Sequence, residues 1–308
     1  MIYTLTTNPA IDMNLTGREI KKNQVNRTFN TVYSPNGKGI NVALVLRHFG
    51  VETTALGFFG GFTGRYIIDR LTELKLPVKP IWVEDITRIN VFVNDGPDEY
   101  KFVNSGSFVP ESKQRELLAQ LQQLDDCTHL VISGSLPQGI SEDYYRDILQ
   151  ICHQKDIQVI LDISSLNLKD LLQERPLLIK PNDEEVQKIF GLPVRSDEDA
   201  FTVMRLLKKQ GAQNVLLTLG AVGAYFSDGR MLYRCSAQKV KLLSSACAGD
   251  AALGAFLSKW LAAGGDIEAA LKRSAATGAN VAESEGLGDF SSVDTYIKNI
   301  IVRKVGQV

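Results

Sequence analysis

The amino-acid sequence predicts an α/β fold in which a mostly parallel sheet is flanked by helices and a smaller sheet lies at its edge. Strand-like and helix-like segments alternate along most of the chain, which is the pattern of parallel sheets with crossover helices. The strand-like segments are short and rich in Leu or β-branched residues, as buried parallel strands are. Two polar segments of alternating character interrupt this order and predict the smaller sheet.

The elements of the main sheet are predicted in a regular order. The short apolar runs predict strands at residues 2–5, 53–57, 129–133, 159–163, 177–179 and 215–219. The longer segments between and after them predict helices at residues 40–49, 64–74, 113–124, 142–153, 183–190, 197–210, 250–263 and 267–285. The first of these helices follows a Gly-rich turn, and the one at 250–263 begins where a Gly-containing turn meets an acidic residue.

The smaller sheet is predicted from residues 13–34 and 87–104. Their period-2 patterning indicates strands with one face in water. We expect these strands to project over the edge of the main domain as a lid. The chain contains no long linker, internal repeat or low-complexity tract, so one domain spanning residues 1–308 is expected.

The bulk composition is that of a soluble globular protein, with 44% hydrophobic and 22% charged residues. The formal net charge is −1 and no long charge run occurs, so neither a nucleic-acid nor a membrane-surface partner is expected. The four cysteines are scattered without metal-site spacing, which favours a reducing compartment. Together with the absence of a basic, cleavable leader at the N-terminus, this predicts a cytoplasmic protein.

The segment from Ser244 to Ala251 carries the first functional signal. It predicts a tight turn that places Asp250 at the start of a buried helix. A helix start offers unpaired backbone N–H groups, which suit an anionic oxygen, and a carboxylate there can accept a proton from an alcohol. Transfer of a phosphoryl group to an alcohol requires this pair of features. Asp is also a favoured N-cap, so simple capping explains the segment as well.

Three further segments are candidates for ligand contacts. The turn Pro35-Asn36-Gly37-Lys38-Gly39 puts a positive charge next to closely spaced glycines, although it does not match a Walker phosphate loop. Asn182 and Glu185 form a capping-box-like pair that could instead hold a hydrated Mg²⁺ through water. The glycines of the segment 220–224 could admit a nucleotide phosphate or form a plain turn.

Three basic residues suit a phosphorylated substrate, because Arg binds phosphate with two parallel hydrogen bonds. They are Arg27, Lys38 and Arg88. Each taken alone is an ordinary surface charge. The glycines at 57–64 follow a strand but lack the Gly-x-Gly-x-x-Gly spacing, so a Rossmann oxidoreductase is a weak alternative.

Taken in order, these segments resemble the ribokinase-type carbohydrate kinases, specifically the phosphofructokinase-B branch. The similarity spans nearly the whole chain and includes the following motifs: Thr7-Asn8-Pro9-Ala10-Ile11-Asp12, Asn36-Gly37-Lys38-Gly39-Ile40-Asn41, Thr87-Arg88-Ile89-Asn90, Ser133-Gly134-Ser135-Leu136-Pro137, Lys180-Pro181-Asn182-x-x-Glu185, Leu219-Gly220-Ala221-x-Gly223-Ala224 and Ala248-Gly249-Asp250.

The resemblance implies a three-layer ribokinase-like sandwich with a small β lid, which often mediates homodimers. It implies MgATP as the phosphoryl donor and a phosphorylated hexose as the acceptor. Asp250 would be the base, in a catalytic segment of Cys247, Ala248, Gly249 and Asp250 whose backbone amides form an anion hole.

The other site residues implied by the resemblance divide by ligand. The sugar would be contacted by Asp12, Gly37, Lys38 and Asn41, and its phosphate by Arg88, Ser135 and Arg27. ATP would be contacted by Lys180, Asn182, Gly220, Ala221, Gly223 and Asn280. Asn182 and Glu185 would organise Mg²⁺ through water.

The sequence departs from the family's pattern at three positions. Cys247 stands where the family usually has the first Gly of Gly-Ala-Gly-Asp, Ala251 replaces a frequent Ser, and Asn36 replaces a Gly in the sugar loop. Because the base and the remaining amides are retained, activity is expected.

The expected reaction is phosphorylation of fructose 1-phosphate to fructose 1,6-bisphosphate. Tagatose 6-phosphate and fructose 6-phosphate are the next candidate acceptors. A non-catalytic sugar-phosphate sensor on a kinase scaffold is the alternative from another functional class, because Cys247 and Ala251 depart from the catalytic pattern.

Overall fold

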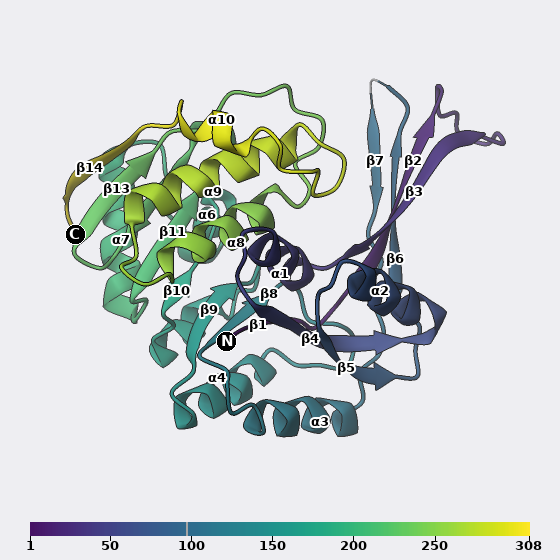
Figure 1. Cartoon of the computed structure of the whole chain (residues 1–308), viewed down its shortest axis with the longest axis horizontal. Coiled ribbons are helices and arrows are strands. Elements are labelled where there is room, and N and C mark those ends of the chain that lie inside the picture. Colours follow the sequence, from purple (N-terminus) through teal and green to yellow (C-terminus); the bar gives the residue numbers. More distant parts are fainter. Residues whose placement is uncertain (97) are drawn as a thin grey trace.

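The computed structural model describes residues 1–96 and 98–308, and its layered arrangement is shown in Figure 1. Pro97, which falls in the predicted segment 87–104, lies outside the described residues. The main sheet has the strand order β14-β13-β12-β11-β10-β9-β8-β1-β4-β5. Seven of these strands form the parallel part: β1 (Ile2–Thr6), β4 (Thr53–Gly60), β5 (Val78–Val83), β8 (His129–Ser133), β9 (Gln158–Asp162), β10 (Leu178–Ile179) and β11 (Asn214–Thr218).

The remaining edge of the main sheet is antiparallel. It is formed by β12 (Ala224–Ser227), β13 (Met231–Cys235) and β14 (Val302–Gln307). Residues 219–223 connect β11 to β12, and three of them form the short 3₁₀ turn η2 (Gly220–Val222).

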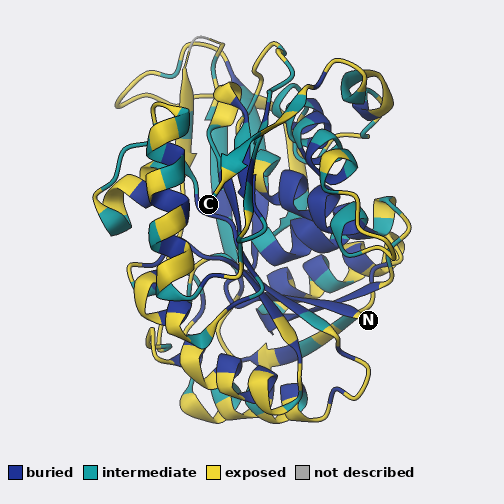
Figure 2. Cartoon of the chain, turned by 90° about the vertical axis from the view of Figure 1, so that its left-hand side faces the viewer, coloured by how far each residue is buried: buried dark blue, intermediate teal, exposed yellow. Residues whose placement is uncertain are grey.

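Helices cover both faces of the main sheet, and Figure 2 shows the buried strands between their exposed outer surfaces. One face packs against α3 (Glu111–Gln122), α4 (Tyr144–Gln154), α5 (Leu168–Leu171), α6 (Asp183–Phe190) and α7 (Asp197–Gln210) in one apolar cluster. The other face packs against α1 (Lys38–His48), α8 (Ala248–Trp260), α9 (Ile267–Ala282) and α10 (Val293–Ile297). A third cluster holds α2 (Gly61–Glu73) beside α1 and β4.

The smaller sheet stands away from the main body in Figure 1. Its strands follow the order β3 (Thr28–Asn36), β2 (Ala10–Gly17), β6 (Arg88–Asn94) and β7 (Glu99–Phe102). β2 follows β1 after three residues, and β3 runs directly into α1. The two ends of this β2–β3 hairpin are therefore attached to the centre of the main body.

The predicted fold class is confirmed: the main sheet is mostly parallel, helices flank it on both sides, and a second sheet forms from the two polar segments. The sequence analysis missed β5, the antiparallel strands β12 to β14, and the short helices α5 and α10. Among the described residues, no helix is both long enough and apolar enough to span a bilayer.

Candidate active site

The candidate site lies at the carboxyl ends of the parallel strands, where ligands bind in open α/β sheets. β9 ends at Asp162, and Lys180 follows β10 directly. Gly37 and Cys247 are the N-cap residues of α1 and α8, and the turns that contain them adjoin these strand ends. Sequence segments more than 200 residues apart thus meet here, as the hydrogen bond between Asn41 and Asp250 shows.

The start of α8 has the geometry of an anion-binding helix terminus. Cys247 is its N-cap in a left-handed conformation, with φ 63° and ψ −13°, and Ala248 is the first helical residue. The amides of Ala248, Gly249 and Asp250 therefore have no carbonyl partner inside the helix. A cysteine thus occupies a left-handed conformation that glycine adopts more easily.

Asp250 is the only acidic residue in the first turn of α8 and is 8% exposed. Asn41 Nδ2 in α1 donates a 2.9 Å hydrogen bond to its Oδ2. Burial, followed by the nearby charge of Asp162, raises the pKa of Asp250 to about 6. A carboxylate with such a pKa is poised to accept a proton near neutral pH.

Close packing of α8 on α1 produces this contact. A Cβ on Gly254 would lie 2.8 Å from the carbonyl oxygen of Val42 and 2.9 Å from Val45 Cβ. Only Gly lets the two helix backbones approach this closely. The distance between Asn41 and Asp250 therefore depends on a residue one turn further along α8.

A buried ion-pair cluster lies beneath the start of α8. Lys180 Nζ is 3.1 Å and Lys38 Nζ is 3.8 Å from Asp162 Oδ1. Burial alone would raise the pKa of Asp162, but the charges of Lys180 and Lys38 outweigh it, so the pKa is lowered and the carboxylate stays ionised. A Cβ on Gly249 would lie 3.6 Å from Lys180 Nζ, so this ammonium sits beside the anion-binding amides.

A second carboxylate, Asp12 in β2, is 6% exposed and held by two amides. Asn90 Nδ2 donates to its Oδ1 at 2.9 Å, and Asn36 Nδ2 donates to its Oδ2. Burial raises the pKa of Asp12, although both amides and Arg88 oppose the shift. Asp12, Asn36, Asn41 and Cys247 all line one cavity of about 300 Å³ between the small sheet and the turns that begin α1 and α8.

The basic residue Arg88 lies close to Asp12 at the start of β6. Its guanidinium donates to the backbone oxygens of Asn8, at 3.0 Å, and Asn104, at 2.7 Å. Asn8 Nδ2 in turn lies 3.4 Å from Ser135 Oγ, so the structure brings Arg88 and Ser135 to opposite ends of one asparagine. Arg88 Nε is buried and has no hydrogen-bond partner among the described residues, which leaves one donor available.

Arg27 is not brought to this group. It is exposed in the connection between β2 and β3 and is absent from the lining of the cavity. None of the hydrogen bonds that join Arg88, Asn8 and Ser135 involves Arg27.

Asn182 and Glu185 form a complete capping box at the start of α6. Glu185 N donates to Asn182 Oδ1 at 2.7 Å, Asn182 N donates to Glu185 Oε2 at 3.0 Å, and Ser164 Oγ donates to Glu185 Oε1. The capping explanation of the sequence is therefore correct. An ionised carboxylate has about four acceptor sites, so the Glu185 side chain can still accept hydrogen bonds from water.

The oxygen donors present fit an ion that keeps most of its waters, as Mg²⁺ does. Among residues 1–96 and 98–308, no group of three or more His, Cys, Asp or Glu side chains could hold a metal directly. The buried Asp162 Oδ2 has no partner within the same residues. Oxygen ligands that act through water match the preference of Mg²⁺ to keep its waters.

The remaining predicted nucleotide residues lie on elements next to this cluster. Thr218 N donates to Pro181 O at 3.1 Å, so the η2 turn with Gly220, Ala221 and Gly223 starts beside the Lys180–Asn182 segment. Asn280 lies in α9, 3% exposed, with its Oδ1 unpartnered among the described residues.

Sequence reasoning missed three residues of this site. Asp162 and Asn90 complete the two carboxylate clusters, and Asn8 joins Arg88 to Ser135. Asp162 carried a usable signal, because it is the acidic residue that ends a buried parallel strand.

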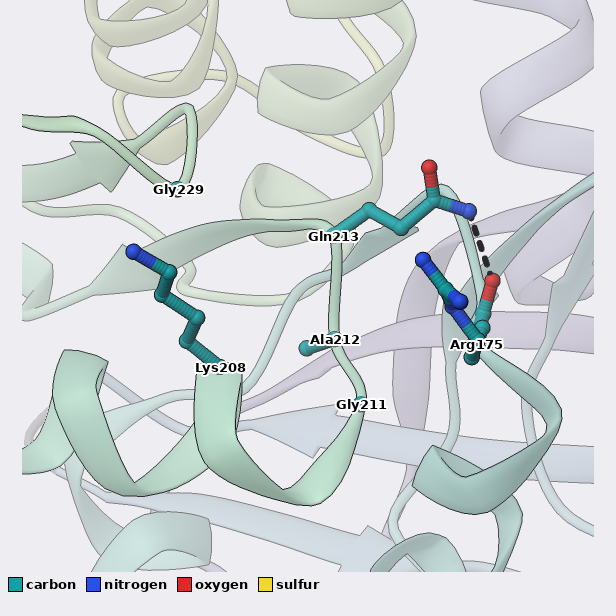
Figure 3. A pocket seen from close by; sticks show the side chains of 6 residues that line it. All are labelled: Arg175, Lys208, Gly211, Ala212, Gln213 and Gly229. Carbon is teal, nitrogen blue, oxygen red and sulfur yellow. Dashed lines mark hydrogen bonds between the residues drawn. The ribbon is translucent and has the colours of Figure 1, made fainter.

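A second hollow, of about 520 Å³, lies at the other end of the strands and is seen in Figure 3. Arg175 precedes β10 and Gln213 precedes β11, and Gln213 Nε2 donates to Arg175 O at 2.8 Å. None of the site residues described above lines it.

The first site therefore combines a buried carboxylate of raised pKa, three unpaired amides and two lysines. Such a group can accept a proton from an alcohol while charge on a transferring phosphoryl group is neutralised. On the small-sheet side, Asp12 adds a second buried carboxylate, and the charge of Arg88 lies close enough to act on it.

Comparisons with known proteins agree with this arrangement. The family model described as pfkB family carbohydrate kinase matches residues 5–294. The chain is 50% identical to D-tagatose-1-phosphate kinase of Klebsiella oxytoca, over 98% of this chain and 99% of that protein. It is 33% identical to 1-phosphofructokinase of Bacillus subtilis, over 99% and 100%. The structure of phosphofructokinase-2 from Escherichia coli with substrates and products superposes with a TM-score of 0.91 at 28% identity, covering 97% and 98% of the two chains.

Proposed function

The chain belongs to the pfkB family of carbohydrate kinases, and on that premise we propose that it phosphorylates the 6-hydroxyl of a ketohexose 1-phosphate with ATP. D-tagatose 1-phosphate is the first candidate acceptor and D-fructose 1-phosphate the second. The product is the corresponding 1,6-bisphosphate, with ADP as the other product.

One observation carries the proposal: the buried Asp250 stands in the first turn of α8, beside the unpaired amides of Ala248 and Gly249. A base and an anion hole within one helical turn suit attack by an alcohol on a phosphoryl group. The left-handed φ of Cys247 supports activity over a non-catalytic sensor, because the start of α8 keeps its shape despite the departure from Gly.

The choice of acceptor rests on the relatives and on the basic residues. Sequence reasoning put D-fructose 1-phosphate first, followed by tagatose 6-phosphate and fructose 6-phosphate. The relative that is 50% identical is named for D-tagatose 1-phosphate, which moves that sugar to first place. Arg88 and Ser135 are the groups that would bind the phosphate already on the sugar.

In the proposed reaction, Asp250 accepts the proton of the acceptor hydroxyl as its oxygen bonds to the γ-phosphorus of ATP and the bond to ADP breaks. The amides at the start of α8 receive the negative charge of the transferring oxygens. Lys38 and Lys180 neutralise phosphate charge, and Asp162 holds both ammonium groups in place. Asp12 and Asn41 contact the sugar.

The nucleotide is proposed to lie over the η2 turn, with Gly220, Ala221 and Gly223 near its phosphates and Asn280 near its base. Asn182 and Glu185 would hold Mg²⁺ through water. When bound, this ion supplies charge neutralisation between the phosphates of ATP.

We further propose that the small sheet closes over the acceptor as a lid on a single 1–308 domain and that two chains associate through it. Its strands and connections expose large apolar side chains, which single soluble domains rarely gather on one element. They are Val25, Phe29, Val32, Tyr33, Phe102 and Val103.

The test is release of ADP from MgATP in the presence of D-tagatose 1-phosphate, D-fructose 1-phosphate, tagatose 6-phosphate, fructose 6-phosphate and unphosphorylated fructose. The expected result is the highest kcat/KM with a ketohexose 1-phosphate. Turnover confined to 6-phosphates would refute the choice of acceptor, and calorimetric binding without any turnover would refute the kinase.

A further inference from the structure

Asn36 is saturated with hydrogen bonds to groups on both sides of the candidate site. Its Nδ2 donates to Asp12 and to Cys247 Sγ, the latter at 3.5 Å. Its Oδ1 accepts from the backbone N of Gly37 and, at 3.0 Å, from Asn41 Nδ2. A side-chain amide has two donors and two acceptor lone pairs, so all four are used.

These contacts make one continuous chain of side chains across the site. Asn41 Nδ2 uses its second hydrogen on Asp250, so the order is Asp12, Asn36, Asn41 and Asp250. Asp12, Asn41 and Asp250 are each less than 9% exposed. The carboxylate proposed to face the acceptor and the proposed base are thus joined through two side-chain amides.

Cys247 supports this chain from the phosphate side. It takes a left-handed φ of 63°, which cysteine adopts rarely, and its thiol contacts the Asn36 amide. Burial raises the pKa of Cys247 to about 12, so the contact is made by a neutral thiol. Asn36 and Cys247 are two of the three departures from the family pattern, and the structure places them in contact with each other.

We propose that Asn36, supported by Cys247, is a positioning residue that fixes Asp12 and Asp250 relative to each other and thereby makes the enzyme selective between ketohexose 1-phosphate epimers. The selectivity rests on the proposed function. With Gly at position 36, Asp12 Oδ2 and Asn41 Nδ2 would each lose a partner.

Selectivity follows from how Asp12 is held. One amide occupies each of its oxygens, so a sugar hydroxyl can donate only along the directions that remain. D-tagatose and D-fructose differ in the configuration of one hydroxyl, at C4. A site built to pair a hydroxyl strongly rejects a ligand that leaves the buried group unpaired. A carboxylate free to rotate would accept either epimer.

The experiment compares wild type with Asn36→Gly, Cys247→Gly and the double variant. We would measure kcat and KM for D-tagatose 1-phosphate and D-fructose 1-phosphate at saturating MgATP. We expect Asn36→Gly to reduce the kcat/KM ratio of the preferred to the other epimer by about 10-fold, of the order of one hydrogen-bonded contact. Cys247→Gly should have a smaller effect in the same direction, and the double variant should resemble Asn36→Gly because the two residues act together.

A carbon-13 NMR titration of Asp250 tests the positioning role without any acceptor. In Asn36→Gly, Asn41 loses its hydrogen bond to residue 36 and is held less firmly. Its hydrogen bond to Asp250, which stabilises the ionised carboxylate, should weaken. The pKa of Asp250 should therefore rise further. Lys38, Lys180 and Asp162 also act on this carboxyl group and are unchanged in the variant.

The control is Asn23→Gly, which makes the same Asn-to-Gly replacement in the exposed connection between β2 and β3, at a φ of 61° that Gly adopts easily. It should change neither the epimer ratio nor the Asp250 titration.

The inference is overturned if Asn36→Gly is folded, as checked by thermal unfolding, and both the epimer ratio and the Asp250 titration are unchanged. If Asn36→Gly does not fold, an unchanged ratio and titration in Cys247→Gly would overturn it. If wild type uses neither ketohexose 1-phosphate, the proposed acceptor is wrong, and the titration still decides the positioning role.

Discussion

Lys180 and Asp162 form a buried ion pair, with Nζ 3.1 Å from Oδ1, directly beside the first turn of α8. Their side chains are 7% and 1% exposed, so neither charge is solvated by water. Removing one partner of such a pair leaves an uncompensated charge in the protein interior. This pair therefore affects both stability and the charge offered to ATP.

Lys180→Met should destabilise the protein strongly, by about 3–5 kcal/mol in the usual range for a broken buried pair. Lys38 Nζ lies 3.8 Å from the same Asp162 oxygen and still compensates part of its charge, so the loss of stability should be near the lower value. Denaturant unfolding measures the change. Adding Asp162→Asn to Lys180→Met should restore most of the stability and none of the turnover. A Lys180→Met enzyme as stable as wild type would contradict the assignment.

Asp250→Asn should reduce kcat by at least ~10²-fold, the lower end for loss of a general base, and leave ATP binding nearly unchanged. The amide keeps the shape of the side chain but cannot take the acceptor proton. Steady-state kinetics and calorimetry with ATP measure the two effects. Near-normal kcat would refute the role of Asp250 as base.

The pH dependence follows from the pKa of about 6 at Asp250. The base is active when ionised, so kcat should fall toward acid pH with a midpoint near 6.

The same pKa shift makes stability depend on pH. The ordinary pKa of an Asp side chain, 3.8, is lower than the value of about 6 in the folded protein, so the stabilising contribution of Asp250 is present below about pH 4 and is lost as the pH rises through 6. Thermal unfolding of Asp250→Asn should therefore occur at a higher temperature than wild type at pH 8 and at the same temperature at pH 4. An equal difference at both pH values would contradict the shift.

Gly254→Ala should separate α8 from α1, because the added Cβ would lie 2.8 Å from the Val42 carbonyl oxygen. We expect a loss of about 1–3 kcal/mol, as for other overpacked sites, together with a lower kcat as Asn41 moves from Asp250. Gly278→Ala in α9 is the control, since its Cβ would come no closer than 3.4 Å to other atoms. Equal stability of the two variants in denaturant would show that the helices tolerate the extra atom.

Phe29→Glu combined with Phe102→Glu should convert the proposed dimer into single chains. These side chains are 42% and 58% exposed in the single chain, and a charge in a buried interface is costly. Sedimentation velocity should show half the mass of wild type. Lys22→Glu, on the exposed connection of the same hairpin, is the control. A wild-type protein that sediments as single chains at micromolar concentration would refute the dimer.

Much of the main fold could be predicted from local signals. Helices α6 and α7 have the predicted ends because Asn182 and Ser196 cap them and Gly191 and Gly211 end them. Two strands of the antiparallel edge, β13 and β14, were missed because charged residues interrupt them and they lack the apolar continuity of buried strands.

The site was also predicted only in part, because some of its residues belong to local motifs and others are brought in by the strand order. Asp250 and Asn41 belong to motifs that can be read locally, but the role of Asp162 depends on which strand ends lie beneath α8. That is a property of the strand order, which no local pattern contains. Arg27 is a basic residue just before β3, but its exposed position outside the cavity depends on how the hairpin stands away from the main body.

The small sheet also divides the chemistry between two bodies. Asp12 lies within β2 and Asn36 ends β3, whereas Asp250, Asp162 and Lys180 belong to the main body. The two strands of this hairpin, with 8 and 9 residues, run from its outer end to Asp12 and Asn36. A molecule bound to the outer part of the hairpin would therefore act on Asp12 and Asn36 and, through the hydrogen bonds of Asn36, on Asn41 and Cys247 at the starts of α1 and α8.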